Sequence, residues 1–244
     1  MLTWEERHRL EQRWFPGIRE HIWGRFRAEL ARHMHPRALV LDAGCGKGSW
    51  LLRQHRGRVR ALVGVDVVVP DEYTLDYFVQ GTLDQLPFPD GQFDVIICND
   101  VIEHLTHPEQ SLAEIARVLR RPSRPGAHDG GRLFFKTPSL QAPATMLAHL
   151  LPYGIHRRTK ALLGIPEDNV FPTQFRCNTP RTIHECLRRC GLEREWFALV
   201  DETFGYFAFN RPLYTVGLLY SRLMHTRFLA PFRNVMMGIY MRVE

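Results

Sequence analysis

Residues 41–48 read Leu-Asp-Ala-Gly-Cys-Gly-Lys-Gly, and this stretch decides the fold. The apolar run at 38–41 leads into it, as expected of a buried parallel strand that enters a tight turn. Glycine permits positive φ angles and lets a ligand approach the backbone closely. In open α/β sheets such a turn lies at the carboxyl end of the strands, where ligands bind. The stretch therefore predicts a strand, a ligand-binding turn and a following helix over 49–54.

The spacing of these glycines separates three kinds of site. A nucleotide phosphate loop needs G-x-x-x-x-G-K-[ST], which neither the lysine nor the spacing matches. A dinucleotide site needs G-x-G-x-x-G, whereas Gly44, Gly46 and Gly48 follow G-x-G-x-G. Asp42 would repel a pyrophosphate but suits a ligand that carries an ammonium group. A tight turn without any ligand is the structural alternative.

Apolar runs alternate with helical patterns along the rest of the chain. Strands are expected at 61–66, 93–98, 132–136, 193–200 and 234–243, and helices at 107–120, 179–191 and 212–228. This alternation predicts a parallel sheet with right-handed crossovers. Residues 3–34 read as two helices, or as one helix that breaks at Pro16-Gly17.

The length of 244 residues permits one large α/β domain. We divide it into N-terminal helices over 1–36, a core over 37–140, an insertion over 141–178, and the rest of the same domain over 179–244. The five cysteines include no C-x-x-C pair, so no metal site is predicted. The sequence has neither a secretory signal nor a long apolar stretch, which favours a cytoplasmic location.

Two more carboxylates occupy positions that suit a nucleoside. Asp66 ends the strand expected at 61–66, where a carboxylate can accept hydrogen bonds from both ribose hydroxyls. Asp84 lies in the loop before the next core strand, where it could accept a hydrogen bond from an adenine amino group. Each aspartate alone is more often a solvated loop residue. Together with Asp42, they indicate a nucleoside-binding site.

With these residues the chain resembles the class I S-adenosylmethionine-dependent methyltransferases, in particular the subgroup with the ubiquinone- and menaquinone-pathway enzymes. The matching segments are LDAGCGKGSW at 41–50, VGVD at 63–66, GTLDQLPFPDGQFDVIICNDVIEHL at 81–105 and GRLFFKTPS at 131–139. The resemblance implies a Rossmann-like, seven-stranded, mostly parallel sheet with flanking helices and a substrate-covering insertion. The loop at 121–131 departs from the family, in which a short Pro-Gly-Gly turn is usual.

The same resemblance implies S-adenosylmethionine as cofactor and S-adenosylhomocysteine as its product. It implies a cofactor-binding set made of Asp42, Gly44, Cys45, Gly46, Asp66, Val67, Leu83, Asp84 and Asn99. The glycine turn and Asn99 would face the methionine part, and Asp66 would hold the ribose. Leu83 and Asp84 would flank the adenine.

Candidate catalytic residues follow the strand expected at 93–98. Methyl transfer from a sulfonium depends largely on positioning, and an oxygen or nitrogen acceptor can also need a base. His104 and Glu103 are candidates for that base, and Asp100 for a substrate contact. The alternative is that Glu103 and His104 only brace the cofactor loop.

A second group of candidates lies in the 141–178 insertion. His156 is a third catalytic candidate, and Tyr153 and Arg157 are candidate substrate contacts. Basic side chains there would suit a phosphate or carboxylate on the substrate. A solvated helix face is the alternative interpretation.

The expected function is transfer of a methyl group to oxygen or nitrogen of a small or lipid-linked metabolite. The alternative is a non-catalytic module that binds S-adenosylmethionine or S-adenosylhomocysteine and scaffolds a partner. The glycine spacing disfavours an NAD-linked oxidoreductase.

The net charge of +6 permits an acidic acceptor, an anionic surface or nucleic acid as partner. Nucleic acid is disfavoured because no binding module is visible. The basic amphipathic helix expected at 212–228 could contact a membrane peripherally. Its alternatives are to cover the sheet or to form a dimer interface, and the sequence predicts no oligomeric state.

Overall fold

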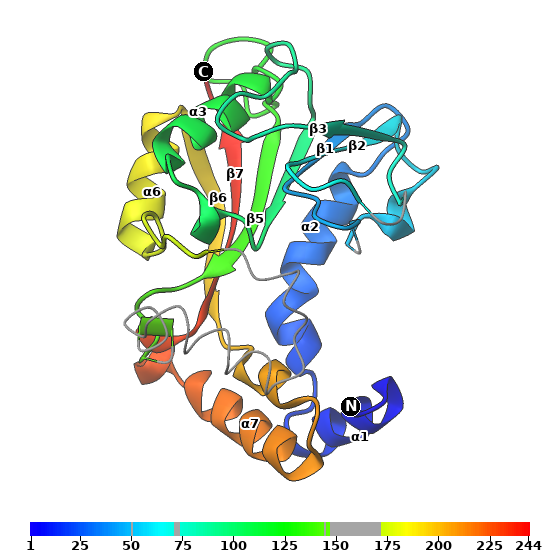
Figure 1. Cartoon of the computed structure of the whole chain (residues 1–244). Coiled ribbons are helices and arrows are strands. Elements are labelled where there is room, and N and C mark those ends of the chain that lie inside the picture. Colours follow the sequence, from blue (N-terminus) through cyan, green and yellow to red (C-terminus); the bar gives the residue numbers. More distant parts are fainter. Residues whose placement is uncertain (50, 71–73, 144, 147–171) are drawn as a thin grey trace. The chain divides into compact units, whose positions relative to one another are not determined.

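The computed structural model describes residues 1–49, 51–70, 74–143, 145–146 and 172–244 (Figure 1). The chain divides into two compact units, each assembled from separate segments. Unit 1 contains Met1–Arg25, Pro138–Thr173 and Leu199–Met236, and unit 2 contains Phe26–Thr137, Gln174–Ala198 and Met237–Glu244. Residues 199–236 thus group with the N-terminal helices in unit 1.

One sheet of seven strands has the order β3-β2-β1-β4-β5-β7-β6, which confirms the predicted Rossmann-like α/β class (Figure 1). The strands are β1 (Leu39–Ala43), β2 (Ala61–Asp66), β3 (Tyr77–Gln80), β4 (Val95–Asn99), β5 (Arg132–Pro138), β6 (Leu192–Val200) and β7 (Val235–Arg242). β1 pairs in parallel with β2 and β4, β2 with β3, and β4 with β5.

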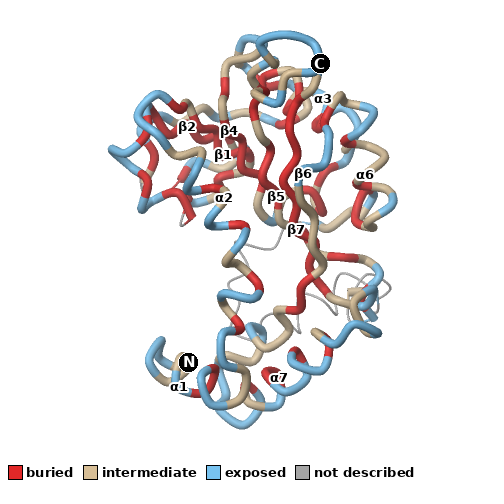
Figure 2. The backbone as a smooth tube through the Cα atoms, turned by 180° about the vertical axis from the view of Figure 1, so that it is seen from behind, coloured by how far each residue is buried: buried red, intermediate tan, exposed pale blue. Residues whose placement is uncertain are grey.

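The central strands are buried, which explains why their sequences are continuous apolar runs rather than alternating ones. Figure 2 shows β1 and β4 almost wholly in the buried colour, and Val40 and Ile96 are both fully buried. The register pairs Asp42 with Gly64 on β2 and with Ile97 on β4. The carboxyl ends of these strands therefore lie next to one another.

Three α-helices lie largely in unit 2, and their ends follow local sequence signals. They are α2 (Arg25–His33), α3 (Pro108–Val118) and α6 (Pro180–Arg189). The Thr179 side chain accepts a hydrogen bond from the Thr182 amide at 3.1 Å, which caps α6. Phe26 of α2 is fully buried and its ring meets that of Phe134 on β5 edge-on, at 5.5 Å between centroids.

A buried carboxylate ties unit 1 together. Among the described residues, its helices include α1 (Trp4–Trp14), the π-helical turn η1 (Glu20–Gly24), η5 (Thr203–Phe207), α7 (Arg211–Met224) and η6 (Arg227–Phe232). Glu11 of α1 is buried, accepts hydrogen bonds from Arg19 at 2.6 and 2.8 Å, and accepts another from the Tyr214 hydroxyl at 2.6 Å. The predicted break at Pro16-Gly17 is confirmed, with Gly17 at φ 73°.

The helix predicted over 49–54 is wrong. The chain there makes a turn and one short 3-10 helix, η2 (Arg53–His55). Gly48 at φ 137° and Gly57 at φ 75° bound the segment and leave too few residues for a stable α-helix. The Ser49 hydroxyl instead accepts the Leu52 amide at 3.3 Å.

Three other elements differ from expectation. Strand β3 was not predicted, because a four-residue edge strand carries too little pattern to stand out from a loop. Strand β4 begins at Val95, since Phe93 makes only an isolated bridge to Leu119. The helix expected at 212–228 ends at Met224, and a 3-10 segment follows.

Candidate active site

The glycine turn follows β1 and is held against β2. The amides of Gly44 and Cys45 both donate to the Val65 carbonyl, at 2.8 and 3.2 Å. Gly44 has φ 84°, and a Cβ atom there would come within 2.4 Å of a methyl group of Val101. At Gly46, with φ 55°, an added Cβ would meet nothing within 4 Å. The turn is thus tightly packed at its first glycine and open at its second.

Asp66 connects the end of β2 to this turn. Its Oδ2 atom accepts the Gly46 amide at 2.7 Å, and its Oδ1 atom accepts the Val68 amide at 2.9 Å. A carboxylate oxygen has two acceptor positions, so each oxygen retains one for a ligand hydroxyl. The adjacent Val67 side chain is exposed, and its carbonyl accepts a hydrogen bond from Gln80 at 2.9 Å.

Asp42 and Cys45 lie beneath the turn rather than on its surface. Asp42 is 5% exposed, and burial raises the pKa of its carboxyl to about 6. The Asp66 charge raises that pKa further, while a hydrogen bond from Ser49 opposes the shift. Burial raises the pKa of the Cys45 thiol to about 12, so this residue acts as a small apolar side chain.

Strand β4 ends in two polar residues that interact with each other. The Asn99 amide nitrogen donates to Asp100 Oδ2 at 3.0 Å, and Lys136 Nζ approaches the same oxygen at 3.2 Å. Asp100 has φ 56°, and its own amide donates to the Lys136 carbonyl at 2.8 Å. The Asn99 Oδ1 atom is buried and accepts no hydrogen bond. An orphaned acceptor at a strand end is an observation that points to a ligand donor.

Glu103 is a second buried acid with a raised pKa in this region. It is 4% exposed, and burial raises the pKa of its carboxyl to about 7, with a smaller contribution from the Asp100 charge. The Thr137 hydroxyl donates to Glu103 Oε2 at 2.9 Å, and Asn178 in turn donates to that hydroxyl at 2.7 Å. His104 Nε2 lies 3.9 Å from the other carboxyl oxygen, Oε1.

The backbone carbonyl of Glu103 accepts hydrogen bonds from residues that are distant in the sequence. The amides of Gln174 and Phe175 both donate to the Glu103 carbonyl, at 2.6 and 3.1 Å. Residues 174–178 therefore contact both the backbone and, through Asn178, the hydrogen-bond chain that reaches the Glu103 carboxyl. Burial raises the pKa of this carboxyl to about 7, which makes Glu103 a candidate general base.

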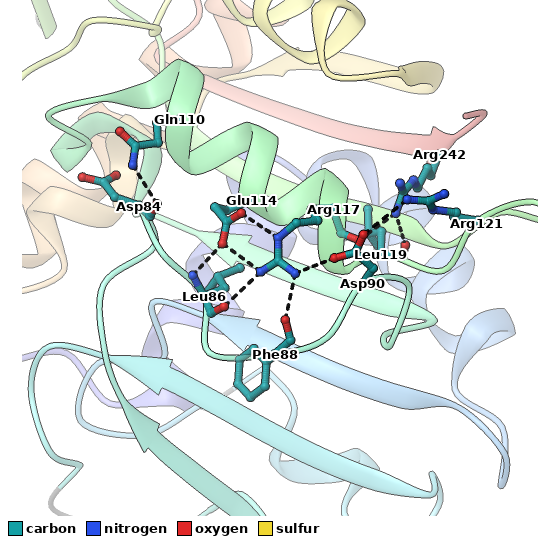
Figure 3. Close-up of polar contacts among 10 residues, drawn as sticks. All are labelled: Asp84, Leu86, Phe88, Asp90, Gln110, Glu114, Arg117, Leu119, Arg121 and Arg242. Atoms are coloured by element: carbon teal, nitrogen blue, oxygen red, sulfur yellow. Dashed lines mark hydrogen bonds and ion pairs between the residues drawn. The ribbon is translucent and has the colours of Figure 1, made fainter.

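The loop over 81–91 is fastened to α3 by Arg117, as Figure 3 shows. The Arg117 guanidinium donates to the carbonyls of Leu86 and Phe88 at 3.0 and 2.9 Å, and forms ion pairs with Glu114 at 2.6 Å and Asp90 at 2.8 Å. These contacts fix the loop that carries the two residues expected at the adenine.

The side chains of Leu83 and Asp84 have different surroundings. Leu83 is buried. The Asp84 carboxylate already accepts a hydrogen bond from the Ser111 hydroxyl and lies 3.2 Å from His107 Nδ1 at the start of α3. Asp84 therefore holds the loop to α3, and a contact with adenine remains a prediction.

The sequence-predicted residues divide into those that the structure describes and those that it does not. The strand ends and following turns bring together Asp42, Gly44, Cys45, Gly46, Asp66, Val67, Asn99, Asp100, Glu103 and His104, and the fastened loop carries Leu83 and Asp84. The candidates Tyr153, His156 and Arg157 lie outside the described residues.

Sequence reasoning missed three residues that support this site. Thr137 and Asn178 reach Glu103 from positions far along the chain, and no local pattern marks them. Arg117 could have been suspected, because Glu114 precedes it by three residues on a helix, but its contacts to the 81–91 loop depend on tertiary structure.

The charge of the site is acidic. Asp42, Asp66, Asp100 and Glu103 lie on or just after three neighbouring strands, and Lys136 pairs with Asp100. A ligand that carries positive charge and ribose hydroxyls fits such a set, since carboxylates attract the cation and accept from the hydroxyls. A pyrophosphate does not fit such a set, because it is itself negatively charged.

Comparisons with known proteins agree with this chemistry. Residues 41–124 match the family model described as a methyltransferase domain. A ubiquinone biosynthesis O-methyltransferase of Xanthomonas oryzae pv. oryzae is 31% identical over 139 residues, covering 49% of this chain and 54% of the relative. The chain thus spans about half the length of the curated relatives of this kind that it matches.

Solved structures extend the likeness of the fold. A geranyl diphosphate methyltransferase in complex with GPP and sinefungin is similar with a TM-score of 0.56 and 16% identity, over 91% of this chain and 80% of that one. The [4+2]-cyclase SpnF gives a TM-score of 0.55 with 18% identity, over 89% of this chain and 80% of that one. At these identities the structural likeness concerns the fold alone.

The match over residues 41–124 and the seven-stranded sheet together indicate an S-adenosylmethionine-dependent methyltransferase domain, whose cofactor is S-adenosylmethionine.

Proposed function

We propose that this protein transfers a methyl group from S-adenosylmethionine to an oxygen or nitrogen atom of a small or lipid-linked metabolite. The observation that carries the proposal is the acidic cluster at the ends of β1, β2 and β4, within a methyltransferase domain. The acids suit a sulfonium-bearing nucleoside, and the near-neutral Glu103 carboxyl suits removal of a proton from an acceptor.

The described residues fit this cofactor. Asp66 retains acceptor positions for the ribose hydroxyls, and the open space at Gly46 leaves room beside the turn. The orphaned Asn99 Oδ1 atom would accept from the ammonium group of the methionine part. Leu83 would contact the adenine. When bound, S-adenosylmethionine supplies an activated methyl group on a sulfonium.

The proposed role of Glu103 is to accept the proton that an acceptor hydroxyl or amine loses. Its Oε2 atom is held by Thr137, which leaves Oε1 on the side of His104. Because the pKa lies at about 7, a large fraction of Glu103 is ionised at neutral pH and still basic enough to take a proton. Thr137 and Asn178 act as positioning residues, and Asp100 is the proposed substrate contact.

The acceptor is proposed from relatives and from charge. The ubiquinone biosynthesis relative is named an O-methyltransferase, which favours an oxygen acceptor and a lipid-linked one. An acidic group on the acceptor would suit Arg157, with Tyr153 and His156 beside it in sequence. Substituting each of these three, and separating KM from kcat, tests their predicted roles.

The first experiment separates binding from turnover. Calorimetric titration with S-adenosylhomocysteine is expected to show one site per chain. Cell extract incubated with the protein and methyl-labelled S-adenosylmethionine is then analysed by mass spectrometry for a labelled product. Binding without any labelled product in extract would support the scaffolding alternative. The cyclase neighbour shows that this fold also occurs in a protein named for another reaction.

A further inference from the structure

Helix α7 has two apolar faces. One is packed within unit 1, and its buried residues are Tyr214, Gly217, Leu218, Ser221 and Met224. The other is exposed to solvent, and its residues are Leu213 (43%), Val216 (61%), Leu219 (42%), Tyr220 (39%) and Leu223 (56%). These five exposed residues form the α7 stripe.

The α7 stripe is continuous along the helix. Successive residues turn by about 100°, so its five members fall within an arc of about 120° on the side opposite the packed face. A 14-residue helix is about 21 Å long, and the stripe runs nearly its whole length. A soluble helix normally presents polar side chains on its outer face. An apolar outer face of this extent indicates a binding surface.

Exposed aromatic residues stand at both ends of α7 in the chain. Tyr206 and Phe209 precede the helix and are 56% and 40% exposed. Phe228 and Phe232, in η6, follow it and are 90% and 46% exposed. Aromatic side chains at the edges of an apolar surface are typical of the interface between water and lipid headgroups.

Within its own segment the stripe is flanked by positive charge alone, while Glu6 of α1 interacts electrostatically with Arg211. The segment 203–243 contains no aspartate or glutamate. Arg211, Arg222 and Arg227 are exposed within it. Arg222 also donates to the Trp14 carbonyl at 3.3 Å, and the Arg233 guanidinium donates to the carbonyls of Leu199 and Met224 and so stabilises unit 1 itself.

We propose that the α7 stripe and its flanking arginines dock on the surface of an anionic lipid bilayer. An amphipathic helix of this kind lies in the interface plane, with apolar side chains inserted and cations among the headgroups. Within the described residues no helix is long and apolar enough to cross a membrane. The proposal goes beyond the reaction proposed above and does not depend on it.

A second copy of the chain is the main competing occupant. In a two-fold symmetric dimer the same surface would meet itself, which would bring the arginines of both copies together. With no acidic residue in 203–243, this segment offers them no partner. An anionic bilayer supplies the missing negative charge as well as the apolar phase.

The test is sedimentation of the full chain with vesicles. One set contains phosphatidylcholine mixed with phosphatidylglycerol, and the other phosphatidylcholine alone. We expect binding to the mixed vesicles that weakens as salt increases. Val216→Glu and Leu223→Glu should each lower the partition coefficient by about tenfold or more, because a charge replaces an inserted apolar side chain. Arg211→Gln, Arg222→Gln and Arg227→Gln should each cost about fivefold on mixed vesicles.

The matched control is Tyr77→Glu, which places the same charge at an exposed apolar residue of β3 that is 65% exposed. It should bind vesicles as the wild type does, and all variants should bind S-adenosylhomocysteine equally. Wild-type protein that stays in the supernatant with both vesicle types would overturn the proposal. So would a loss of binding in Tyr77→Glu equal to that in Val216→Glu, or a dimer that Val216→Glu dissociates without any vesicle binding. Because cofactor binding is measured separately, failure here leaves the proposed methyl transfer standing.

Discussion

The strand ends of unit 2 and the α7 stripe of unit 1 differ in charge, polarity and exposure. At the strand ends, Asp42 and Glu103 are buried, Asp66 is half-buried and Asp100 is exposed, and both carboxylate oxygens of Asp66 accept backbone amides. On α7, large apolar side chains are exposed among arginines. The net charge of +6 is therefore an average over an acidic site and a basic surface.

The comparison teaches that overall charge says little about the ligand of either region. A basic chain can carry an acidic cofactor site, because buried charges respond to partners within a few ångströms. If the two regions have separate roles, substitutions in one should leave the readout of the other unchanged. The predictions below use that separation.

The largest effect is expected from Glu103→Gln. The amide keeps the shape and can still accept from Thr137, but it cannot take a proton, so kcat should fall about 1,000-fold. Labelled product formation measures kcat, and calorimetry should show unchanged affinity for S-adenosylhomocysteine. In the wild type, activity should rise with pH through the pKa of about 7. An unchanged kcat would reduce Glu103 to a bracing residue.

Asp66→Ala should lower the affinity for S-adenosylhomocysteine by about 100-fold, because two charge-assisted hydrogen bonds are lost. Asp129→Ala is the matched control, since Asp129 lies in the 121–131 loop and its carboxylate accepts from Ser123. Vesicle binding should not change in either variant. Equal affinity in wild type and Asp66→Ala would remove Asp66 from the cofactor site.

Gly44→Ala should lower the free energy of unfolding by about 2–3 kcal/mol, since the new methyl group meets Val101 in a positive-φ conformation. Gly46→Ala is the control, as it shares the positive φ without the close contact, and should cost about 1 kcal/mol. Urea denaturation measures both. Adding Val101→Ala to Gly44→Ala should recover part of the loss, and no recovery would contradict the assigned cause.

The pH dependence of stability tests the burial of Glu103. Its pKa is about 7 in the folded protein against an ordinary value of 4.5, so the folded state holds the proton more tightly. The resulting stabilisation is complete below pH 4.5 and is lost as pH rises through 7. Between pH 5 and pH 7 it should fall by roughly 2 kcal/mol in the ligand-free protein.

Glu103→Gln removes this contribution, so the free energy of unfolding of that variant should fall less over the same pH range. Asp42, whose pKa is raised to about 6, should continue to contribute in the variant. Parallel curves for wild type and variant would show that Glu103 is not buried in solution as it is in the structure.

Much of the fold was predictable because its signals are local. Apolar runs identified β1, β2 and β5 closely, and Thr179-Pro180 marked the start of α6. The segment over 49–54 was mispredicted because its length, set by two positive-φ glycines, overrode its helical pattern. β3 was missed because four edge residues show no clear periodicity.

The candidate site was predictable at the strand ends and not in its supports. Asp66 was expected because parallel strands end at one edge of a sheet, and Asn99 because of the family resemblance. The competing contacts of Asp84 with Ser111 and His107 were not, since they depend on where α3 packs.

By itself, the sequence determined the α/β class, the glycine turn and the acids that end the strands, because periodicity and residue type act over a few neighbouring positions. Only the tertiary structure decided the chemical state of those acids. Burial in the fold raises the pKa of Glu103 to about 7, and the hydrogen bond from Thr137, which Asn178 contacts from far along the chain, opposes that shift. The same holds for α7: its pattern marked an apolar helix, and packing decided which apolar face was covered and which was left for a partner.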